Sequence, residues 1–146
     1  MKKLNKILLI TLITLSYINV NAQGVSPDNE AITLQTKKVF EHHMEAFSNG
    51  DVEETLKDYT DDSVIISKGI NSRGYIKGLA EIRANFNSVY TTFFPPATTN
   101  MQVLTVTIIG EMAYVTWTSS TTDFTTDTFV VKNGKITSQT FTANYK

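Results

Sequence analysis

FEHHMEAFSNGDVEETLKDYTDDSVII, residues 40–66, predicts the end of one helix, the start of a second helix and the entry into a strand. Gly50 stands where the C-terminus of a helix favours a residue that can adopt a positive φ. Asp51 and Glu54 follow in the spacing of a capping box, which begins a new helix. The run of Val and Ile at positions 64–66 is β-branched and typical of a strand. We therefore expect one helix to fold back into another before the chain enters a sheet.

A long first helix is predicted from Pro27 to about Asn49, with Ser26 as its N-cap and proline in its first position. Its apolar residues recur every three or four positions, so one side of the helix is expected to face a core. Adjacent residues on a helix point about 100° apart, so two neighbouring histidines have different environments. His43 lies near the edge of the apolar stripe, and His42 is expected to face solvent. The stripe consists of Thr36, Phe40, Met44 and Phe47.

The second helix is predicted from Asp51 to about Tyr59, and a third begins at Gly78 and ends at Pro95-Pro96. Beyond residue 100 the period of the apolar residues changes to two, which predicts strands. Asn133-Gly134 is a strong signal for a hairpin turn between two of them. Helices before a run of strands, without βαβ alternation, indicate an α+β fold with a curved, mostly antiparallel sheet. The expected strands cover residues 63–68, 75–76, 101–109, 112–123, 126–132 and 135–145.

The N-terminus has the pattern of a secretory signal peptide over residues 1–22. Three lysines precede an apolar run at residues 7–18 that is too short for a stable membrane span. Val20-Asn21-Ala22 then offers the small residues that signal peptidase reads, so we expect cleavage after Ala22. The alternative is a retained N-terminal anchor. Residues 23–146 are expected to form one domain in the periplasm or outside the cell.

Composition excludes several classes of function. The chain has no cysteine, which excludes disulfides, thiol catalysis and the lipid-modified cysteine of a bacterial lipoprotein. It carries 13 basic and 14 acidic side chains, and removal of the three signal-peptide lysines leaves a net charge of about −4. Because no basic stripe accompanies this charge, we expect no nucleic-acid partner. No membrane contact is expected after signal cleavage either.

The residue patterns predict no metal and no cofactor. His42 and His43 point too far apart to grip one ion, and Glu41 and Glu45 do not complete a His-Glu-x-x-His motif. No P-loop, Rossmann fingerprint or nucleophile elbow is present in the sequence. Two kinds of function remain: binding of a molecule inside a pocket, and proton transfer to or from such a molecule.

The element order and the Asn49-Gly50-Asp51 helix break resemble the nuclear transport factor 2-like superfamily, which includes SnoaL-like cyclases and ketosteroid isomerases. The resemblance covers nearly all of residues 23–146. It implies a cone-shaped α+β fold in which three helices and a curved sheet enclose a pocket. Relatives often pair through the outer face of the sheet, so the resemblance also implies a homodimer as an assembly to test.

In ketosteroid isomerases, a tyrosine of the first helix and a protonated aspartic acid of a late strand donate hydrogen bonds to the substrate, and another aspartate takes the proton. The resemblance places His43 at the tyrosine position and Asp127 at the donor position. Ser67 falls where the aspartate base would stand, and serine is no base, so the chain departs from the isomerase pattern. Strand alternation independently puts Asp127 on the same face as Phe129 and Val131.

We therefore expect His43 and Asp127 to meet across an apolar pocket, as acid-base and as hydrogen-bond donor or orienting group. Either residue could instead be structural. Three functions stay open: a proton-transfer enzyme of the isomerase, dehydratase or cyclase type, a noncatalytic module that binds a mostly apolar small molecule, and a homodimeric interaction module with a filled pocket. The expected ligand-binding residues are Phe40, Phe47, Ser67, Phe86, Tyr90, Trp117, Phe129, Gln139 and Phe141.

Overall fold

Three helices and six strands make up the part of the chain that a computed structural model describes, residues 27–68, 74–96 and 98–146. The predicted signal peptide, residues 1–22, lies outside the described residues. No helix within the described ranges is long and apolar enough to cross a membrane. The helices are α1 (Pro27–Asn49), α2 (Val52–Leu56) and α3 (Leu79–Thr92), and the strands are β1 (Val64–Lys68), β2 (Tyr75–Lys77), β3 (Gln102–Ile109), β4 (Met112–Thr118), β5 (Thr122–Lys132) and β6 (Lys135–Tyr145).

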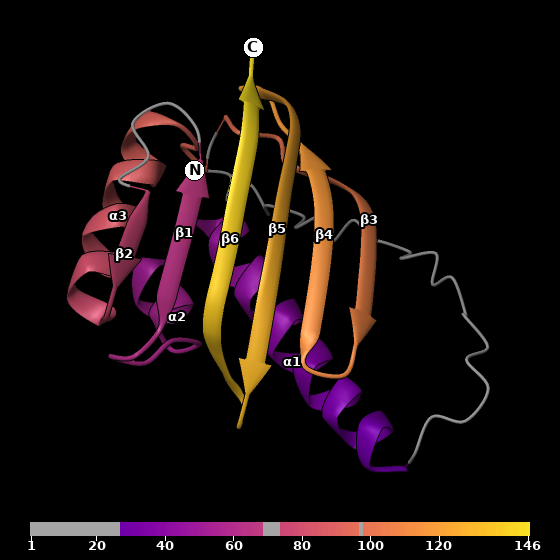
Figure 1. Cartoon of the computed structure of the whole chain (residues 1–146). Coiled ribbons are helices and arrows are strands. Elements are labelled where there is room, and N and C mark those ends of the chain that lie inside the picture. Colours follow the sequence, from indigo (N-terminus) through magenta and orange to yellow (C-terminus); the bar gives the residue numbers. More distant parts are fainter. Residues whose placement is uncertain (1–26, 69–73, 97) are drawn as a thin grey trace, which may run out of the picture.

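The six strands form one curved sheet in the order β2-β1-β6-β5-β4-β3 (Figure 1). The last strand of the chain, β6, therefore lies in the interior of the sheet, parallel to β1 and antiparallel to β5. All other neighbouring pairs are antiparallel. This confirms the predicted α+β fold with a mostly antiparallel sheet.

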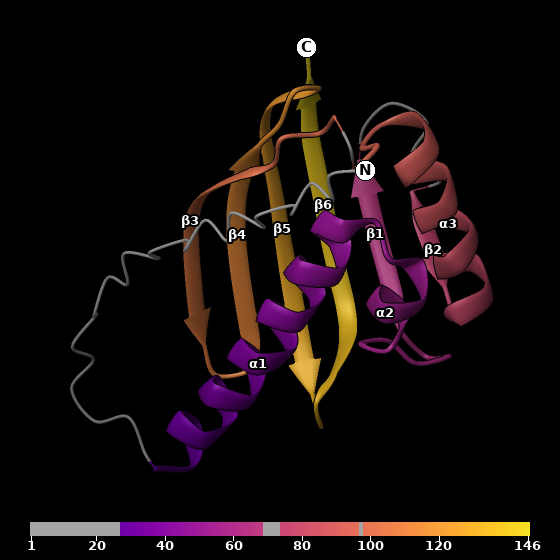
Figure 2. The ribbon, with the colours of Figure 1, turned by 180° about the vertical axis from the view of Figure 1, so that it is seen from behind.

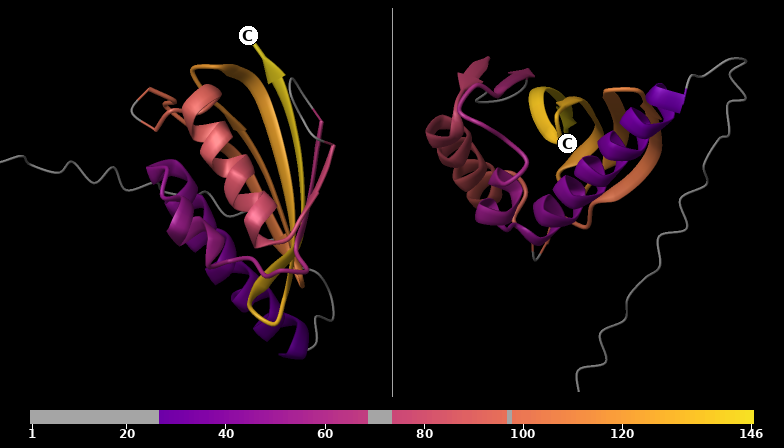
Figure 3. Two further views of the ribbon diagram at one scale, coloured as in Figure 1. Left: turned by 90° about the vertical axis from the view of Figure 1, so that its left-hand side faces the viewer. Right: turned by 90° about the horizontal axis from the view of Figure 1, so that it is seen from below.

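The helices cover one face of the sheet, with α1 running across the strands and α3 lying beside β1 and β2 (Figures 2 and 3). The apolar side of each helix packs on this face. Phe40 of α1 contacts the ring of Phe129 edge-on at a centroid distance of 5.8 Å, and Ile82 of α3 is fully buried. Burial of such side chains supplies the main favourable term for folding. The opposite face of the sheet carries no helix in the described part of the chain (Figure 3).

The helix break at Gly50 forms as the sequence predicts. Gly50 has a φ of +67° and donates its N–H to the carbonyl of Phe47 at 3.0 Å, which closes α1. The carboxylate of Asp51 then accepts the N–H of Glu54 at 2.9 Å and caps α2. Pro96 packs so closely on Gly50 that an added Cβ would lie 2.1 Å from its Cγ. The turn therefore requires glycine for its φ and also for the space.

One turn of the sheet lies elsewhere than predicted. The sequence predicts strands at 112–123 and 126–132, but β4 ends at Thr118 and β5 begins at Thr122. The Ser119 side chain accepts the backbone N–H of Thr121 and of Thr122, each at 3.1 Å, and so stabilises a turn. The prediction was wrong here because serine and threonine fit both a strand and a side-chain-stabilised turn.

Gly50→Ala is expected to lower the free energy of unfolding by roughly 2–4 kcal/mol, about half from the left-handed backbone and the rest from overlap with Pro96. Gly74→Ala is the matched control, because Gly74 has a φ of +75° and no atom within 4 Å of an added Cβ. Urea unfolding of both variants measures the difference. Equal losses would show that the contact with Pro96 contributes nothing.

Candidate ligand pocket

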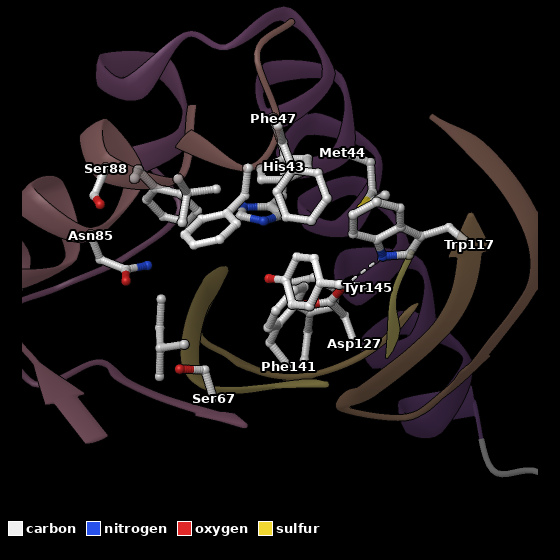
Figure 4. Close-up of a pocket in the computed structure, with 16 residues that line it drawn as sticks. His43, Met44, Phe47, Ser67, Asn85, Ser88, Trp117, Asp127, Phe141 and Tyr145 are labelled. Carbon is white, nitrogen blue, oxygen red and sulfur yellow. Dashed lines mark hydrogen bonds between the residues drawn. The ribbon is translucent and has the colours of Figure 1, made fainter. Parts of the chain in front are cut away.

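A partly open cavity lies between the helices and the sheet, with a volume of about 80 Å³ available to the centres of water-sized molecules. That space exceeds the roughly 10–15 Å³ needed for one water, so the cone is not filled by its own side chains. Figure 4 shows His43 and Phe47 on the helix wall, opposite Asp127 and Phe141 on the sheet wall. The lining residues are His43, Met44 and Phe47 of α1, Ile65 and Ser67 of β1, Asn85, Phe86, Ser88 and Val89 of α3, Phe93 and Phe94 after α3, and Trp117, Asp127, Phe129, Phe141 and Tyr145 of β4, β5 and β6.

His43 sits in the helix wall of this cavity with 1% of its surface exposed. Its imidazole lies among aromatic rings, 4.9 Å from Phe129 and 5.5 Å from Tyr59 between centroids. The buried Nδ1 atom has no hydrogen-bond partner among the residues that the structure describes, and Oδ2 of Asp58 lies 3.6 Å from it. No local pattern singles out Asp58, since an acidic residue after a short helix usually faces water.

His42 points away from the cavity, as predicted, but it is only partly solvated. Its Nδ1 contacts both carboxylate oxygens of Asp58 at 2.8 and 3.0 Å, and its Nε2 contacts Glu54 at 2.9 Å. Hydrogen bonds that His42 donates to Glu54 and then to Asp58 raise its pKa above the ordinary value, since only the charged imidazolium can donate from both nitrogens. His42 thus joins the end of α1 to α2 and to the segment after it.

Asp127 is buried in the sheet wall and both of its carboxylate oxygens accept hydrogen bonds. The indole N–H of Trp117 donates to Oδ2 at 2.8 Å, and the amide of Gln139 donates to Oδ1 at 2.7 Å. The hydroxyl of Tyr59 in turn donates to the amide oxygen of Gln139. Burial raises the pKa of Asp127, while the bonds from Trp117 and Gln139 oppose the rise. Fully bonded in this way, Asp127 acts as an acceptor.

The structure brings His43 and Asp127 to opposite walls of one cavity, yet no hydrogen bond joins them among the described residues. Asp58 supplies the carboxylate oxygen that lies 3.6 Å from Nδ1 of His43, and Asp127 interacts with His43 only electrostatically, across the cavity. Six of the predicted ligand-binding residues line the cavity, namely Phe47, Ser67, Phe86, Trp117, Phe129 and Phe141.

Three of the predicted ligand-binding residues lie outside the lining. Phe40 is buried in the core beside Phe129, and the amide of Gln139 is held behind Asp127. Tyr90 lies with its hydroxyl 3.4 Å from Thr55, and burial raises its pKa to about 12. The polar residues Asn85 and Ser88 were missed, although their places on the apolar side of α3 next to Phe86 and Val89 could have indicated them.

No group of three or more His, Asp or Glu side chains in the described part of the chain is arranged to hold a metal ion. The polar groups of the cavity are two serines, an amide, an imidazole, a phenol and one carboxylate. Such groups can bind an uncharged polar substituent and can exchange a proton with it.

The cone of helices over a curved, open sheet, with a cavity inside, defines a domain of the nuclear transport factor 2-like class. The SnoaL-like domain family matches residues 40–139, so the chain belongs to the family of SnoaL-like domains. No curated protein sequence matches it.

Solved structures share this fold at low identity. A nuclear transport factor 2-like protein of unknown function from Burkholderia xenovorans is 18% identical, with a TM-score of 0.61 over 76% of this chain and 84% of that chain. A similar protein of unknown function from Mesorhizobium loti is 14% identical, with a TM-score of 0.64 over 77% and 93%. SalBIII, an epoxide hydrolase/cyclase-like enzyme of pyran ring formation in the polyether salinomycin, is 18% identical, with a TM-score of 0.61 over 76% and 92%. These likenesses establish the fold.

The free energy of unfolding is expected to fall as the pH rises from about 6.5 through the raised pKa of His42, because the imidazolium loses its bonds to Glu54 and Asp58. Salt is expected to weaken this dependence, since His42 is partly exposed. Urea unfolding between pH 6 and 9 measures it. His42→Gln should lose this part of the slope, and Lys38→Gln, which removes a charge from an exposed position of α1, should keep it. An unchanged slope in His42→Gln would contradict the assignment.

Proposed function

We propose that this SnoaL-like domain binds a small, mostly apolar organic molecule in the cavity between α1, α3 and the sheet. The observation that carries the proposal is a cavity whose walls are mainly aromatic but which has a few convergent polar groups. Sites for small molecules have this composition, because apolar walls supply affinity and polar groups fix orientation. Ser67, Asn85 and Ser88 are suited to a hydroxyl or carbonyl group of the ligand.

Proton transfer to or from the bound molecule is the chemistry that fits these side chains best. His43 is the only imidazole in the lining, and general acid-base catalysis most often uses histidine. Asp127 serves to orient, since its oxygens already accept two protein donors. The enzyme SalBIII shares the fold and is described as epoxide hydrolase/cyclase-like, which supports a reaction of the isomerase, dehydratase or cyclase type.

We place this function in the periplasm or outside the cell, after cleavage behind Ala22. The support is the lysine-rich start, the apolar run at residues 7–18 and the small residues before the cleavage site. The intact mass of the protein purified from its native organism tests this directly, because a cleaved chain begins at Gln23.

The ligand is tested by purifying the protein from its native organism and identifying released molecules by mass spectrometry after gentle denaturation. Wild type is expected to release a stoichiometric, mostly apolar compound. Ser67→Phe should abolish recovery, since Ser67 faces the cavity. Ile66→Phe is the matched control, because the neighbouring side chain lies on the opposite face of β1 and is 51% exposed. Equal recovery from both variants would contradict binding in this cavity, and an empty wild type would favour the interaction module.

A homodimer through the outer sheet face is the second candidate, and an uncharged row of residues across the middle of this face supports it. The uncharged part is a row of paired residues that crosses all six strands between the exposed Lys68 and Lys77 of the same face: Tyr75, Ile66, Thr140, Thr128, Tyr114 and Thr107. Two of them, Tyr75 and Ile66, are large apolar side chains that are more than half exposed. A surface without charge can meet its own copy about a two-fold axis without repulsion.

Light scattering at micromolar concentration is expected to show a dimer of wild type. Thr140→Lys places a charge near the centre of the row and should give a monomer, because two copies would bury like charges against each other. Asn87→Lys, at an exposed position of α3, should remain a dimer. A monomeric wild type would remove the proposal.

A further inference from the structure

Two adjacent histidines reach the same carboxylate from the two sides of the helix layer. His43 faces the cavity and has Nδ1 3.6 Å from Oδ2 of Asp58. His42 faces outward and has Nδ1 2.8 Å from Oδ1 of the same residue. Sequence neighbours on a helix diverge, so a shared partner requires a carboxylate placed between them.

Asp58 is held firmly in that place. Its side chain is 8% exposed, and its backbone carbonyl accepts the N–H of Ile136, in β6, at 2.7 Å. His42, itself bonded to Glu54 as an imidazolium, donates to the carboxylate and compensates its charge. A carboxylate oxygen has more than one acceptor position, so Asp58 can accept from His42 on one side and from a second donor on the other.

The surroundings of His43 leave one arrangement for a neutral imidazole. Its buried Nδ1 faces a carboxylate oxygen that accepts from His42, and a nitrogen lone pair aimed at this oxygen would be repelled, whereas an N–H is attracted. The proton therefore belongs on Nδ1, and Nε2 carries the lone pair. The separation of 3.6 Å is longer than a hydrogen bond, as is common for catalytic pairs before a ligand closes the site.

We propose that Asp58 is the positioning residue of a His43–Asp58 pair, which holds Nε2 of His43 unprotonated toward the cavity as a proton acceptor. The proposal deepens the proposed function and rests on it, since it assigns the pocket a substrate with an acidic proton, such as a C–H beside a carbonyl. His42 holds the carboxylate from outside.

The proposed step moves one proton and needs no further reactant. Nε2 takes the proton from the substrate, whose bonding electrons stay behind as an enolate-like anion. The resulting imidazolium of His43 faces two carboxylates, Asp58 beside it and Asp127 across the cavity, and the phenol of Tyr59. The same proton then returns from Nε2 to another atom of the substrate, which regenerates the neutral imidazole.

The test is the protonation pattern of His43 in the ligand-free protein, read from ¹⁵N imidazole shifts at pH 8. The chain has two histidines, so the spectrum holds two patterns, and His43→Gln identifies which one is lost. Wild-type His43 is expected to carry its proton on Nδ1 alone. A proton on Nε2, or on both nitrogens, overturns the proposal. This measurement needs no substitution at Asp58 and no ligand.

Asp58→Asn is the variant that discriminates positioning from packing. With the amide oxygen held by His42, the amide N–H₂ takes the place of Oδ2 and donates to Nδ1 of His43, so the proton is expected to move to Nε2. Glu54→Gln is the control, because it changes the outer partner of His42 without touching His43, and should leave the proton on Nδ1.

A folded Asp58→Asn protein whose His43 keeps its proton on Nδ1 overturns the positioning role. The outcome is separable from that of the ligand search, since an empty cavity contradicts the proposed function but leaves the position of this proton unchanged. Once a substrate is known, Asp58→Asn should lower kcat by about 10²–10⁴-fold with little change in KM, as expected for loss of an oriented base.

Discussion

The missing side chain of Gly50 is the constraint on which the rest of this molecule depends. Only a hydrogen fits beneath Pro96 at that point, and only glycine adopts the local backbone conformation without strain. The contact joins the end of α1 to the segment that leaves α3. Phe47 and Phe94, which precede the two contacting residues, meet at a centroid distance of 6.1 Å and close one part of the cavity. The contact therefore holds the end of α1 in a fixed position relative to the segment after α3, and these two parts form one side of the helix wall.

Rules for helix caps and tight turns predicted the ends of the elements well where a residue type strongly favours one cap or turn. Glycine after a helix, aspartate before the next helix and Asn133-Gly134 in a hairpin are each typical of one cap or turn. All three form in the structure. The turn at Ser119 was missed because hydroxyl side chains serve turns and strands alike. Strand alternation predicted the burial of Asp127, but its partners Trp117 and Gln139 depend on strand register, which no local pattern specifies.

Asp58 escaped prediction for a related reason. An acidic residue near the end of a short helix is common in any sequence. Only the packing of α1 against Asp58 brings two histidines to its one carboxylate. Burial of polar groups in the core costs free energy, because each group loses its hydrogen bonds to water and needs a partner inside the protein. A core of this size could be built from apolar residues alone, so stability does not explain the buried carboxyl group of Asp127 among aromatic rings.

The position of β6 has a consequence for how the chain is made. The eleven residues of β6 form an interior strand, which separates the early strand β1 from the three strands that precede β6 in sequence. The sheet cannot close around its core until β6 has been synthesised, because β1 and β5 have no common neighbour before then. Contacts between such distant segments also form slowly. A chain of this topology therefore stays open while it emerges from the ribosome.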